Sequence, residues 1–236
     1  MSRTSHLAYA TTLALFSGVL TVTAPAAAHS AGTSHTVAAS QGGALAERAA
    51  RPRLVALTFD DGPSPYTNAI LAVLRRNKVH ATFFALGTQV RKYPSMSRKI
   101  VREGHRLGDH SWNHPDLTRL SNADARSQVT RTRDQIQATT HVTVTAFRFP
   151  YGSSNARTRD IVRRCHLRIV GWNVDPQDWA EPAPSTITSR ILDAVRPGRT
   201  NIVIMHDGGG NRRNTIASLD NTIRALKKRG YHFVLA

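Results

Sequence analysis

Two hydrophobic patterns alternate along the chain from residue 53 onward. Short, nearly continuous apolar runs such as 53–59 (RLVALTF) and 201–205 (NIVIM) predict buried strands. Apolar residues spaced along one helical face, as in 66–77, predict amphipathic helices between the strands. The further predicted strands are 80–86, 142–149, 167–172 and 231–236, with a short segment at 105–110. The further predicted helices are 94–103, 121–138 with Ser121 as its cap, 155–165, 185–195 and 214–229.

This alternation predicts an α/β fold in which a mostly parallel sheet is covered by outer helices. The number of strand and helix units, about seven, favours a closed or nearly closed barrel over an open sheet. The sequence carries no repeated motif and no sign of a second domain. We therefore expect a single catalytic domain over residues 52–236, which is long enough to bury a real core.

Residues 1–28 have the pattern of a secretory signal peptide. An arginine and a histidine precede an apolar stretch at 7–22, and three alanines at 26–28 offer a small-residue cleavage site. A retained membrane anchor is the alternative, but the apolar stretch is short and interrupted by Thr, Ser and Gly. Residues 29–51, rich in Ala, Ser, Gly and Thr, indicate a flexible leader. We expect a secreted protein without membrane contact after cleavage.

The composition is strongly basic, with 32 lysines and arginines, 15 acids and a formal net charge of +17. Such a balance favours anionic partners, although solvated surface also accounts for much of the charge. Nucleic-acid binding is not expected, because the chain has no zinc-finger spacing, RNA-binding aromatic motif or helix-turn-helix signature. Anionic cell-wall polymers fit an exported protein better. The single Cys165 excludes an internal disulfide, and we expect a monomer.

Acids and histidines gather directly after the predicted strands. Six acids occupy these turns: Asp60, Asp61, Asp109, Asp175, Asp178 and Asp207. His110, His114 and His206 follow strands in the same way, and Arg148 ends another strand. In a barrel of alternating strands and helices, the carboxyl ends of the strands carry the active site. We therefore expect these side chains to meet at one end of the barrel.

His110 and His114 have a spacing typical of metal ligands, since residues four apart share one face of a helical turn. Two surface histidines are the common alternative for this spacing alone. The acid pair Asp60 and Asp61 at the matching end of another strand favours a metal. Two histidines and one aspartate leave a coordination position for water, which is typical of catalytic sites. One acid then ligates the ion, and its neighbour stays free to accept a proton.

Five segments, in this order, resemble the motifs of one enzyme family: TFDDGP, HSWNH, RFPY, DPQDW and IMH. Over residues 53–236 the chain is similar to the polysaccharide deacetylases, also called family 4 carbohydrate esterases or NodB homology domains. The resemblance implies a distorted, incomplete (β/α) barrel of parallel strands with outer helices. It also implies metal-dependent hydrolysis of acetyl groups on N- or O-acetylated sugars. Zn²⁺ is the expected ion, with Co²⁺ as an alternative.

The resemblance also assigns roles to residues on the metal side of the site. Asp61, His110 and His114 correspond to the metal ligands. Asp60 corresponds to the general base, and Arg148 to the residue that orients it. The two acids of the doublet therefore have different tasks.

In the same resemblance, His206 corresponds to the general acid, and Asp178 pairs with it and raises its pKa. The backbone amide of Tyr151 is expected to stabilise the oxyanion. A small apolar pocket for the acetyl methyl group is implied, lined by Trp179, Ile204 and Pro150. Ile204 replaces the leucine usual in the family, which conserves the volume.

These residues predict a secreted hydrolase that removes acetyl groups from N-acetylglucosamine polymers, either chitin-like oligomers or peptidoglycan. An O-acetyl esterase acting on acetylated xylan is the alternative, because the same groups can attack either carbonyl. A third hypothesis is a basic cell-wall-binding protein that has lost catalysis. A serine esterase is not favoured, since Ser64 and Ser111 have no Ser-His-Asp arrangement in the sequence.

Three features near the motifs have more than one interpretation. Asp109 is either an acceptor for an imidazole N–H or, as we favour, a solvated turn acid. Trp112 either stacks on a sugar ring or packs against the barrel rim. The glycine-rich run 207–211 lacks the ending of a phosphate-binding loop, so we interpret it as a permissive loop beneath His206.

Overall fold

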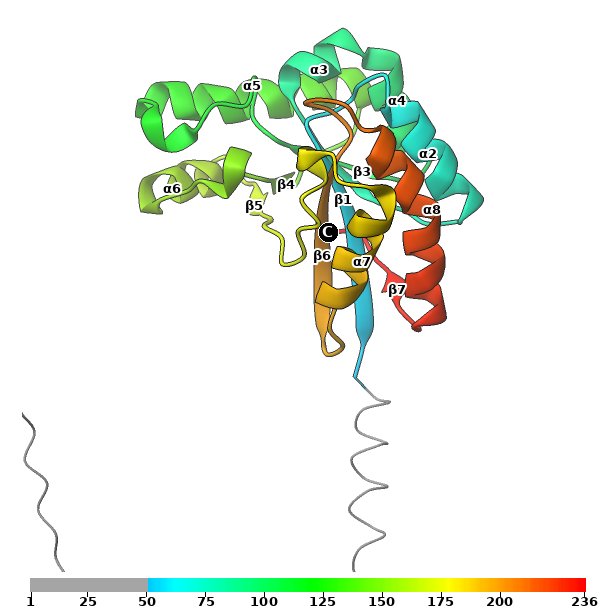
Figure 1. Cartoon of the computed structure of the whole chain (residues 1–236). Coiled ribbons are helices and arrows are strands. Elements are labelled where there is room, and N and C mark those ends of the chain that lie inside the picture. Colours follow the sequence, from blue (N-terminus) through cyan, green and yellow to red (C-terminus); the bar gives the residue numbers. More distant parts are fainter. Residues whose placement is uncertain (1–50) are drawn as a thin grey trace, which may run out of the picture. The chain divides into compact units, whose positions relative to one another are not determined.

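The fold was analysed in a computed structural model, which describes residues 51–236 (Figure 1). The strands are β1 (Arg53–Asp60), β2 (Thr82–Ala85), β3 (Arg106–Asp109), β4 (Ala146–Phe147), β5 (Arg168–Ile169), β6 (Arg199–His206) and β7 (His232–Phe233). The helices are α2 (Thr67–Arg76), α3 (Gly87–Lys92), α4 (Pro94–Arg102), α5 (Asn122–Thr140), α6 (Ala156–Arg164), α7 (Pro184–Ala194) and α8 (Arg213–Lys228). Short 3-10 helices are η1 (Leu117–Arg119), η2 (Pro150–Gly152) and η3 (Asp178–Ala180).

The strands form one parallel sheet in the order β5-β4-β3-β2-β1-β6. β6 pairs with β1 along its whole length, while β7 pairs with the first half of β1 and β2 with its second half. After β5 the chain crosses back, and Val174 forms a parallel bridge with Val203 of β6. The sheet therefore curls toward closure, which confirms the predicted distorted, incomplete (β/α) barrel.

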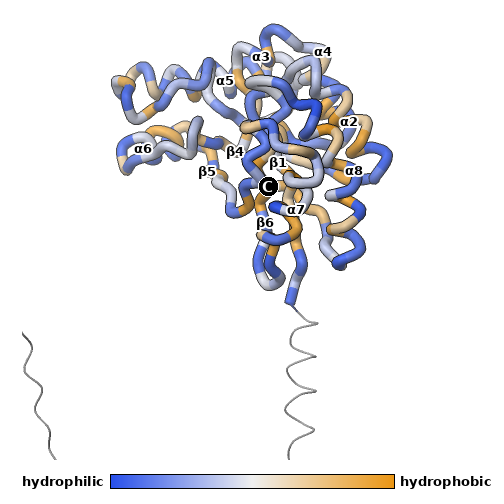
Figure 2. The backbone as a smooth tube through the Cα atoms, in the orientation of Figure 1, coloured by the Kyte–Doolittle hydropathy of each residue, from blue (hydrophilic) through white to orange (hydrophobic). Residues whose placement is uncertain are grey.

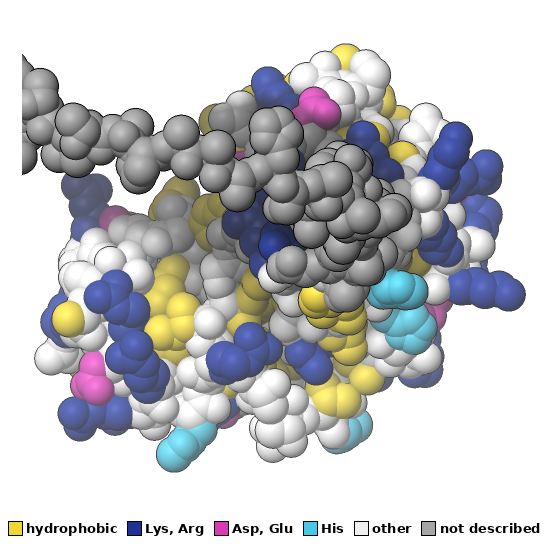
Figure 3. All heavy atoms as spheres, turned by 90° about the horizontal axis from the view of Figure 1, so that it is seen from below, with side chains coloured by type: hydrophobic (Ala, Val, Ile, Leu, Met, Phe, Trp, Pro, Cys, Tyr) yellow, Lys and Arg dark blue, Asp and Glu magenta, His cyan; other side chains and the backbone are white. Residues whose placement is uncertain are grey.

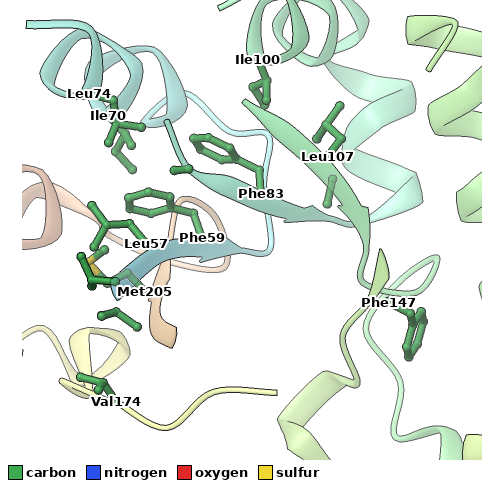
Figure 4. Close-up of a cluster of buried hydrophobic side chains, with 14 of the residues drawn as sticks. Leu57, Phe59, Ile70, Leu74, Phe83, Ile100, Leu107, Phe147, Val174 and Met205 are labelled. Atoms are coloured by element: carbon green, nitrogen blue, oxygen red, sulfur yellow. The ribbon is translucent and has the colours of Figure 1, made fainter. Parts of the chain in front are cut away.

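The two faces of the sheet bury different side chains. Successive residues of a strand point to opposite faces, so Leu57 and Phe59 of β1 face the helices and Ala56 faces the barrel interior. The large outer cluster is partly shown in Figure 4, where the labelled residues include Leu57, Phe59, Ile70, Leu74, Phe83 and Met205. The interior cluster is small and consists of Ala56, Phe84, Ala146, Val170 and Ala236. Polar side chains can therefore enter the barrel from the carboxyl ends of the strands.

Local sequence explains where the helices begin and end. Ser121 caps α5 by accepting a hydrogen bond from the Asp124 N–H at 3.1 Å, which confirms the predicted cap. Asn155 and Thr158 form a capping box at the start of α6. The predicted helices agree with the observed ones to within about two residues at each end. Figure 2 shows the central strands β1 and β6 as largely hydrophobic segments between hydrophilic turns.

The structure corrects the predicted lengths of three strands and adds one helix. The strands expected at 142–149, 167–172 and 231–236 shorten to two residues each, in β4, β5 and β7. β3 and β4 share the single register pair Asp109 and Phe147, because the curled sheet lets neighbouring strands overlap only briefly. Helix α3 was not predicted, because its sequence, GTQVRK, buries only Gly87 and Val90 and carries no helical apolar stripe.

Predictions for the amino-terminal region lie mostly outside the described residues. The predicted signal peptide, 1–28, and all but the last residue of the predicted leader, 29–51, belong to this group. Within residues 51–236, no helix combines the length and apolar character that crossing a bilayer requires.

Candidate active site

A cleft of about 760 Å³ opens at the carboxyl ends of the strands. Its lining is Asp60, Asp61, Leu86, His110, His114, Phe149, Tyr151, Trp172, Asp175, Trp179, Ile204, His206, Gly209 and Arg212. The lining combines acids, histidines and aromatic rings from segments that are far apart in the sequence. This mixture is typical of a binding or catalytic site.

The side chains of Asp60 and Asp61 point in different directions at the end of β1. Asp60 is the last residue of the strand, continues its alternation and is buried. Asp61 has a left-handed backbone, with φ at 73°, so its side chain leaves in another direction. The turn is held by the 207–211 loop, since the N–H groups of Asp207 and Gly208 donate to the Asp60 carbonyl at 3.0 and 3.2 Å. Neighbouring acids can therefore serve different partners.

Asp61 meets two histidines. Its Oδ1 lies 3.6 Å from His110 Nε2 and 3.4 Å from His114 Nε2, and one ligand atom from each residue falls within 4.8 Å of the others. This buried Oδ1 has no hydrogen-bond partner among residues 51–236. A buried carboxylate oxygen that accepts no hydrogen bond is rare unless it binds a cation. Two imidazole nitrogens and one carboxylate oxygen fit a divalent ion of the zinc type.

The ring of His110 is oriented for metal binding by a hydrogen bond on the side away from Asp61. Its Nδ1 lies 2.8 Å from the carbonyl oxygen of Arg148, which can only accept, so the proton is on Nδ1 and Nε2 offers a lone pair toward Asp61. Burial lowers the pKa of His110 to about 3, although the negative charge of Asp61 opposes this shift. The ring is therefore neutral at physiological pH, which is the form that binds metals.

The helical turn expected between the two histidines is absent. The segment between His110 and His114 is a loop, in which Ser111 and His114 have φ values of 73° and 66°. The ring centroids still lie 5.0 Å apart. Our premise that helical periodicity brings them together was wrong, because the backbone reverses its twist at both positions.

Arg148 supports Asp60 from inside the barrel. It is fully buried, and Nη1 donates to Asp60 Oδ1 at 2.9 Å and to Thr58 Oγ1 at 2.7 Å. Its other nitrogens donate to the carbonyls of Val170 and Gly171. Burial raises the pKa of Asp60 even though the Arg148 charge lowers it. The free oxygen, Oδ2, faces the cleft 3.7 Å from His110 Nε2.

His206, the register neighbour of Asp60 on the adjacent strand β6, is paired with Asp178. Its Nδ1 lies 2.7 Å from Asp178 Oδ1, and its backbone N–H donates to Oδ2 at 2.9 Å. The hydroxyl of Thr215 also donates to Oδ2, at 2.8 Å. Burial lowers the pKa of His206, but the hydrogen bond and charge of Asp178 outweigh it, so the net shift is upward. Because Nδ1 is held by the carboxylate, Nε2 is the nitrogen that can exchange a proton.

The expected apolar pocket is present only in part. Trp179 and Ile204 line the cleft, and Trp179 is half exposed. Pro150 is buried and is not among the cleft-lining residues of the described chain. Tyr151 has a left-handed backbone, with φ at 58°, and its exposed ring packs edge-on against His114 at 4.4 Å.

The structure bears on the three features that had more than one interpretation, namely Asp109, Trp112 and the 207–211 loop. Asp109 is fully buried on the outer face of the sheet, where burial raises its pKa, so the expectation of a solvated turn acid was wrong. Its Oδ1 accepts from the Ser111 N–H at 2.8 Å. Trp112 is buried against Gly87, with the Arg131 guanidinium 4.2 Å from its ring, which favours packing over sugar stacking. The 207–211 loop contacts Asp61 closely, since a Cβ at Gly209 would lie 2.5 Å from Asp61 Oδ2.

Sequence reasoning missed several residues around the site. Trp172 and Leu86 line the cleft, and both lie at the ends of predicted strands, a position that could have identified them. Thr58 begins the TFDDGP segment but was given no role, and Thr215 and Arg212 carried no local signal. Their contacts depend on distant segments, as when Arg212 Nε donates to the Gly208 carbonyl at 2.7 Å.

Comparison with known proteins gives a consistent picture. Residues 47–170 match the polysaccharide deacetylase family, so Asp178 and His206 lie beyond the matched range. The peptidoglycan-N-acetylmuramic acid deacetylase PdaC of Bacillus subtilis is 39% identical over 183 residues, which cover 77% of this chain. A chitooligosaccharide deacetylase of Bradyrhizobium sp. is 38% identical over 192 residues, covering 76% of this chain and 87% of the relative.

A solved structure is similar over most of the described chain. It is the peptidoglycan N-acetylglucosamine deacetylase Bc1960 in complex with a hydroxamate-type ligand, with 33% identity and a TM-score of 0.75. The match covers 78% of this chain and 86% of that chain. By contrast, this chain spans only 38% of the length of PdaC. The further segments of that longer relative therefore have no counterpart in the alignment.

Proposed function

Because this chain belongs to the polysaccharide deacetylase family, we propose that it is a secreted, metal-dependent hydrolase that removes acetyl groups from N-acetylglucosamine-containing polysaccharide. The observation that carries the proposal is the unpartnered, buried Oδ1 of Asp61 between His110 and His114. Two titratable groups, Asp60 and His206, line the same cleft.

Asp61, His110 and His114 would hold a divalent ion, Zn²⁺ or alternatively Co²⁺, which would polarise the acetyl carbonyl and make water more acidic. Asp60 accepts a proton from the attacking water through Oδ2, while Arg148 fixes Oδ1. This interaction keeps the carboxylate pointed into the cleft. Asp60 is thus the general base.

His206 completes the reaction as the proton donor. Its Nε2–H donates a proton to the departing amine nitrogen as the carbon–nitrogen bond breaks, and Asp178 stabilises the protonated ring before the transfer. The Tyr151 backbone N–H hydrogen-bonds the oxygen that becomes negative during attack. Trp179 and Ile204 contact the acetyl methyl group. The products are acetate and a free amino sugar.

The basic surface supports a location near anionic wall polymers. Figure 3 shows lysine and arginine side chains spread over the described face, with few acidic ones among them. The formal charge of +17 gives such polymers a strong long-range attraction. We expect a monomer that meets its polymer substrate at the cell wall.

The test is acetate release by the full chain from N-acetylglucosamine oligomers, peptidoglycan and acetylated xylan. We expect activity on the first two, its loss on treatment with EDTA and its return when Zn²⁺ or Co²⁺ is added. Activity unaffected by chelation would contradict the metal site. Faster release from acetylxylan would favour the O-acetyl esterase, and tight polymer binding without acetate release under any metal would favour a non-catalytic wall-binding protein.

A further inference from the structure

The loop between the two metal-site histidines has an unfavourable backbone. Ser111 and His114 both have positive φ values, at 73° and 66°. A non-glycine residue in this region is unfavourable unless the surroundings stabilise it. Because His114 is itself one of the proposed ligands, whatever holds this loop also sets the position of its imidazole.

Side chains satisfy every N–H group of residues 111–114. The Ser111 N–H donates to Asp109 Oδ1 at 2.8 Å, and the His114 N–H donates to Ser111 Oγ at 3.1 Å. The N–H groups of Trp112 and Asn113 both donate to Oε1 of Gln128, at 2.9 and 3.2 Å. Gln128 Nε2 in turn donates to Asn113 Oδ1 at 2.8 Å. One amide on α5 therefore makes three of the contacts that define the loop.

The opposite side of the loop is fixed by α3. The N–H groups of Gly87 and Thr88, at the start of that helix, donate to the carbonyls of Ser111 and Trp112 at 3.1 and 3.0 Å. Helices α3 and α5 pack against each other, and the loop is hydrogen-bonded to both. The carbonyls of Ser111 and Trp112 are thus held by α3, and the amides of Trp112 and Asn113 by Gln128.

We propose that Gln128 is a positioning residue that raises the metal affinity of the site by holding the loop between His110 and His114. The inference rests on the proposed metal-dependent function. Gln128 does not line the cleft and makes no hydrogen bond to either histidine side chain, so its effect is transmitted through the backbone of residues 112 and 113. Without it, these amides turn to water, and the His114 imidazole is no longer held against Asp61 Oδ1.

The chain offers a matched control on the same helix. Gln135 is half buried like Gln128, but its Nε2 donates to Thr139 Oγ1 within α5 at 2.9 Å. The experiment compares Gln128→Ala with Gln135→Ala in the full chain after metal removal. Zn²⁺ is titrated in competition with a chromophoric chelator, and thermal unfolding of the metal-free proteins is recorded in parallel. We expect Gln128→Ala to bind Zn²⁺ roughly tenfold more weakly than the wild type, and Gln135→Ala to bind it equally well.

Two further measurements separate positioning from general stability. Excess Zn²⁺ is expected to restore acetate release in Gln128→Ala, because the catalytic groups themselves are intact. Gln128→Glu keeps an acceptor oxygen for both amides, and we expect its Zn²⁺ affinity to stay close to that of the wild type. Equal Zn²⁺ affinity of wild type and Gln128→Ala would overturn the inference while leaving the proposed function standing. A wild-type protein that binds no Zn²⁺ would contradict both the inference about Gln128 and the proposed metal-dependent function.

Discussion

The two cleft residues to which we assign proton transfer, Asp60 and His206, have their pKa values set in opposite ways. Asp60 has a charged partner in Arg148, yet burial outweighs this partner and the pKa of the carboxyl is raised. His206 is also buried, but there the hydrogen bond and charge of Asp178 outweigh burial, and the pKa of the imidazole is raised. In the metal-free protein, burial thus makes Asp60 more basic, and Asp178 keeps His206 protonated to higher pH; a bound divalent ion would oppose the shift at Asp60.

This difference teaches that similar-looking ion pairs can have different uses. At Asp60 the partner mainly fixes geometry, since Arg148 also reaches Thr58 and two backbone carbonyls and cannot move with the carboxylate. At His206 the partner mainly sets the charge of the ring. We therefore expect removal of Arg148 and removal of the Asp178 charge to have different consequences.

Arg148→Met should have the largest effect on stability. It leaves Asp60 buried without a counter-charge, and breaking such a pair typically costs about 3–5 kcal/mol. Urea unfolding at neutral pH measures the free energy of unfolding. The double variant Arg148→Met with Asp60→Asn should recover part of the loss, because it removes the stranded charge. A double variant no more stable than Arg148→Met would contradict the idea that the unpaired carboxylate carries the cost.

Asp178→Asn should have a smaller effect on stability and a large one on turnover. The amide oxygen can still accept from His206 Nδ1, but the negative charge that raises the pKa of the ring is gone. His206 must be protonated to donate, so the high-pH limb of the rate profile is expected to move to lower pH. At pH 8 we expect a loss of about 10²-fold or more in kcat. An unmoved limb would mean that another group is the acid.

Thr215→Val should have the smallest effect. It removes one hydroxyl hydrogen bond to Asp178 Oδ2, a contact of about 1.5–3 kcal/mol when the acceptor is charged. Thr222→Val, on the same helix, is the matched control, because Thr222 Oγ1 donates to the Ser218 carbonyl instead. Both variants should lose stability, but only Thr215→Val should shift the pH–rate profile. Equal profiles would show that Thr215 is purely structural.

Most of the fold was predictable from local sequence. Continuous apolar runs identify β1 and β6, and helical periodicity with a Ser121 cap identifies α5. Helix α3 was not predicted, and strands β4 and β5 were predicted in the right places but too long. Their limits depend on how the sheet curls and which neighbours remain in reach, and neither property is encoded by periodicity within the segment.

The site divides along a similar line. The order of motifs brings Asp61, His110 and His114 to one place, because the carboxyl ends of parallel strands meet at one edge of the sheet. The helical interpretation of the histidine spacing failed, since the loop depends on Gln128, which lies 14 residues after His114 on another element. Thr215 was also not predicted, because its contact with Asp178 joins two segments that are far apart in the sequence. Groups that support the site through long-range contacts leave no pattern near the motif.

We propose that Asp60 is the base and Asp61 the metal ligand, although both approach His110, at 3.7 and 3.6 Å. Asp61 also reaches His114, at 3.4 Å. The direct measurement is the Zn²⁺ content, after desalting, and the acetate release of Asp60→Asn and Asp61→Asn. Asp61→Asn should lose the metal and the activity together. Asp60→Asn should keep its Zn²⁺ and lose about 10²–10⁴-fold in rate. Equal metal loss in both variants would contradict the division.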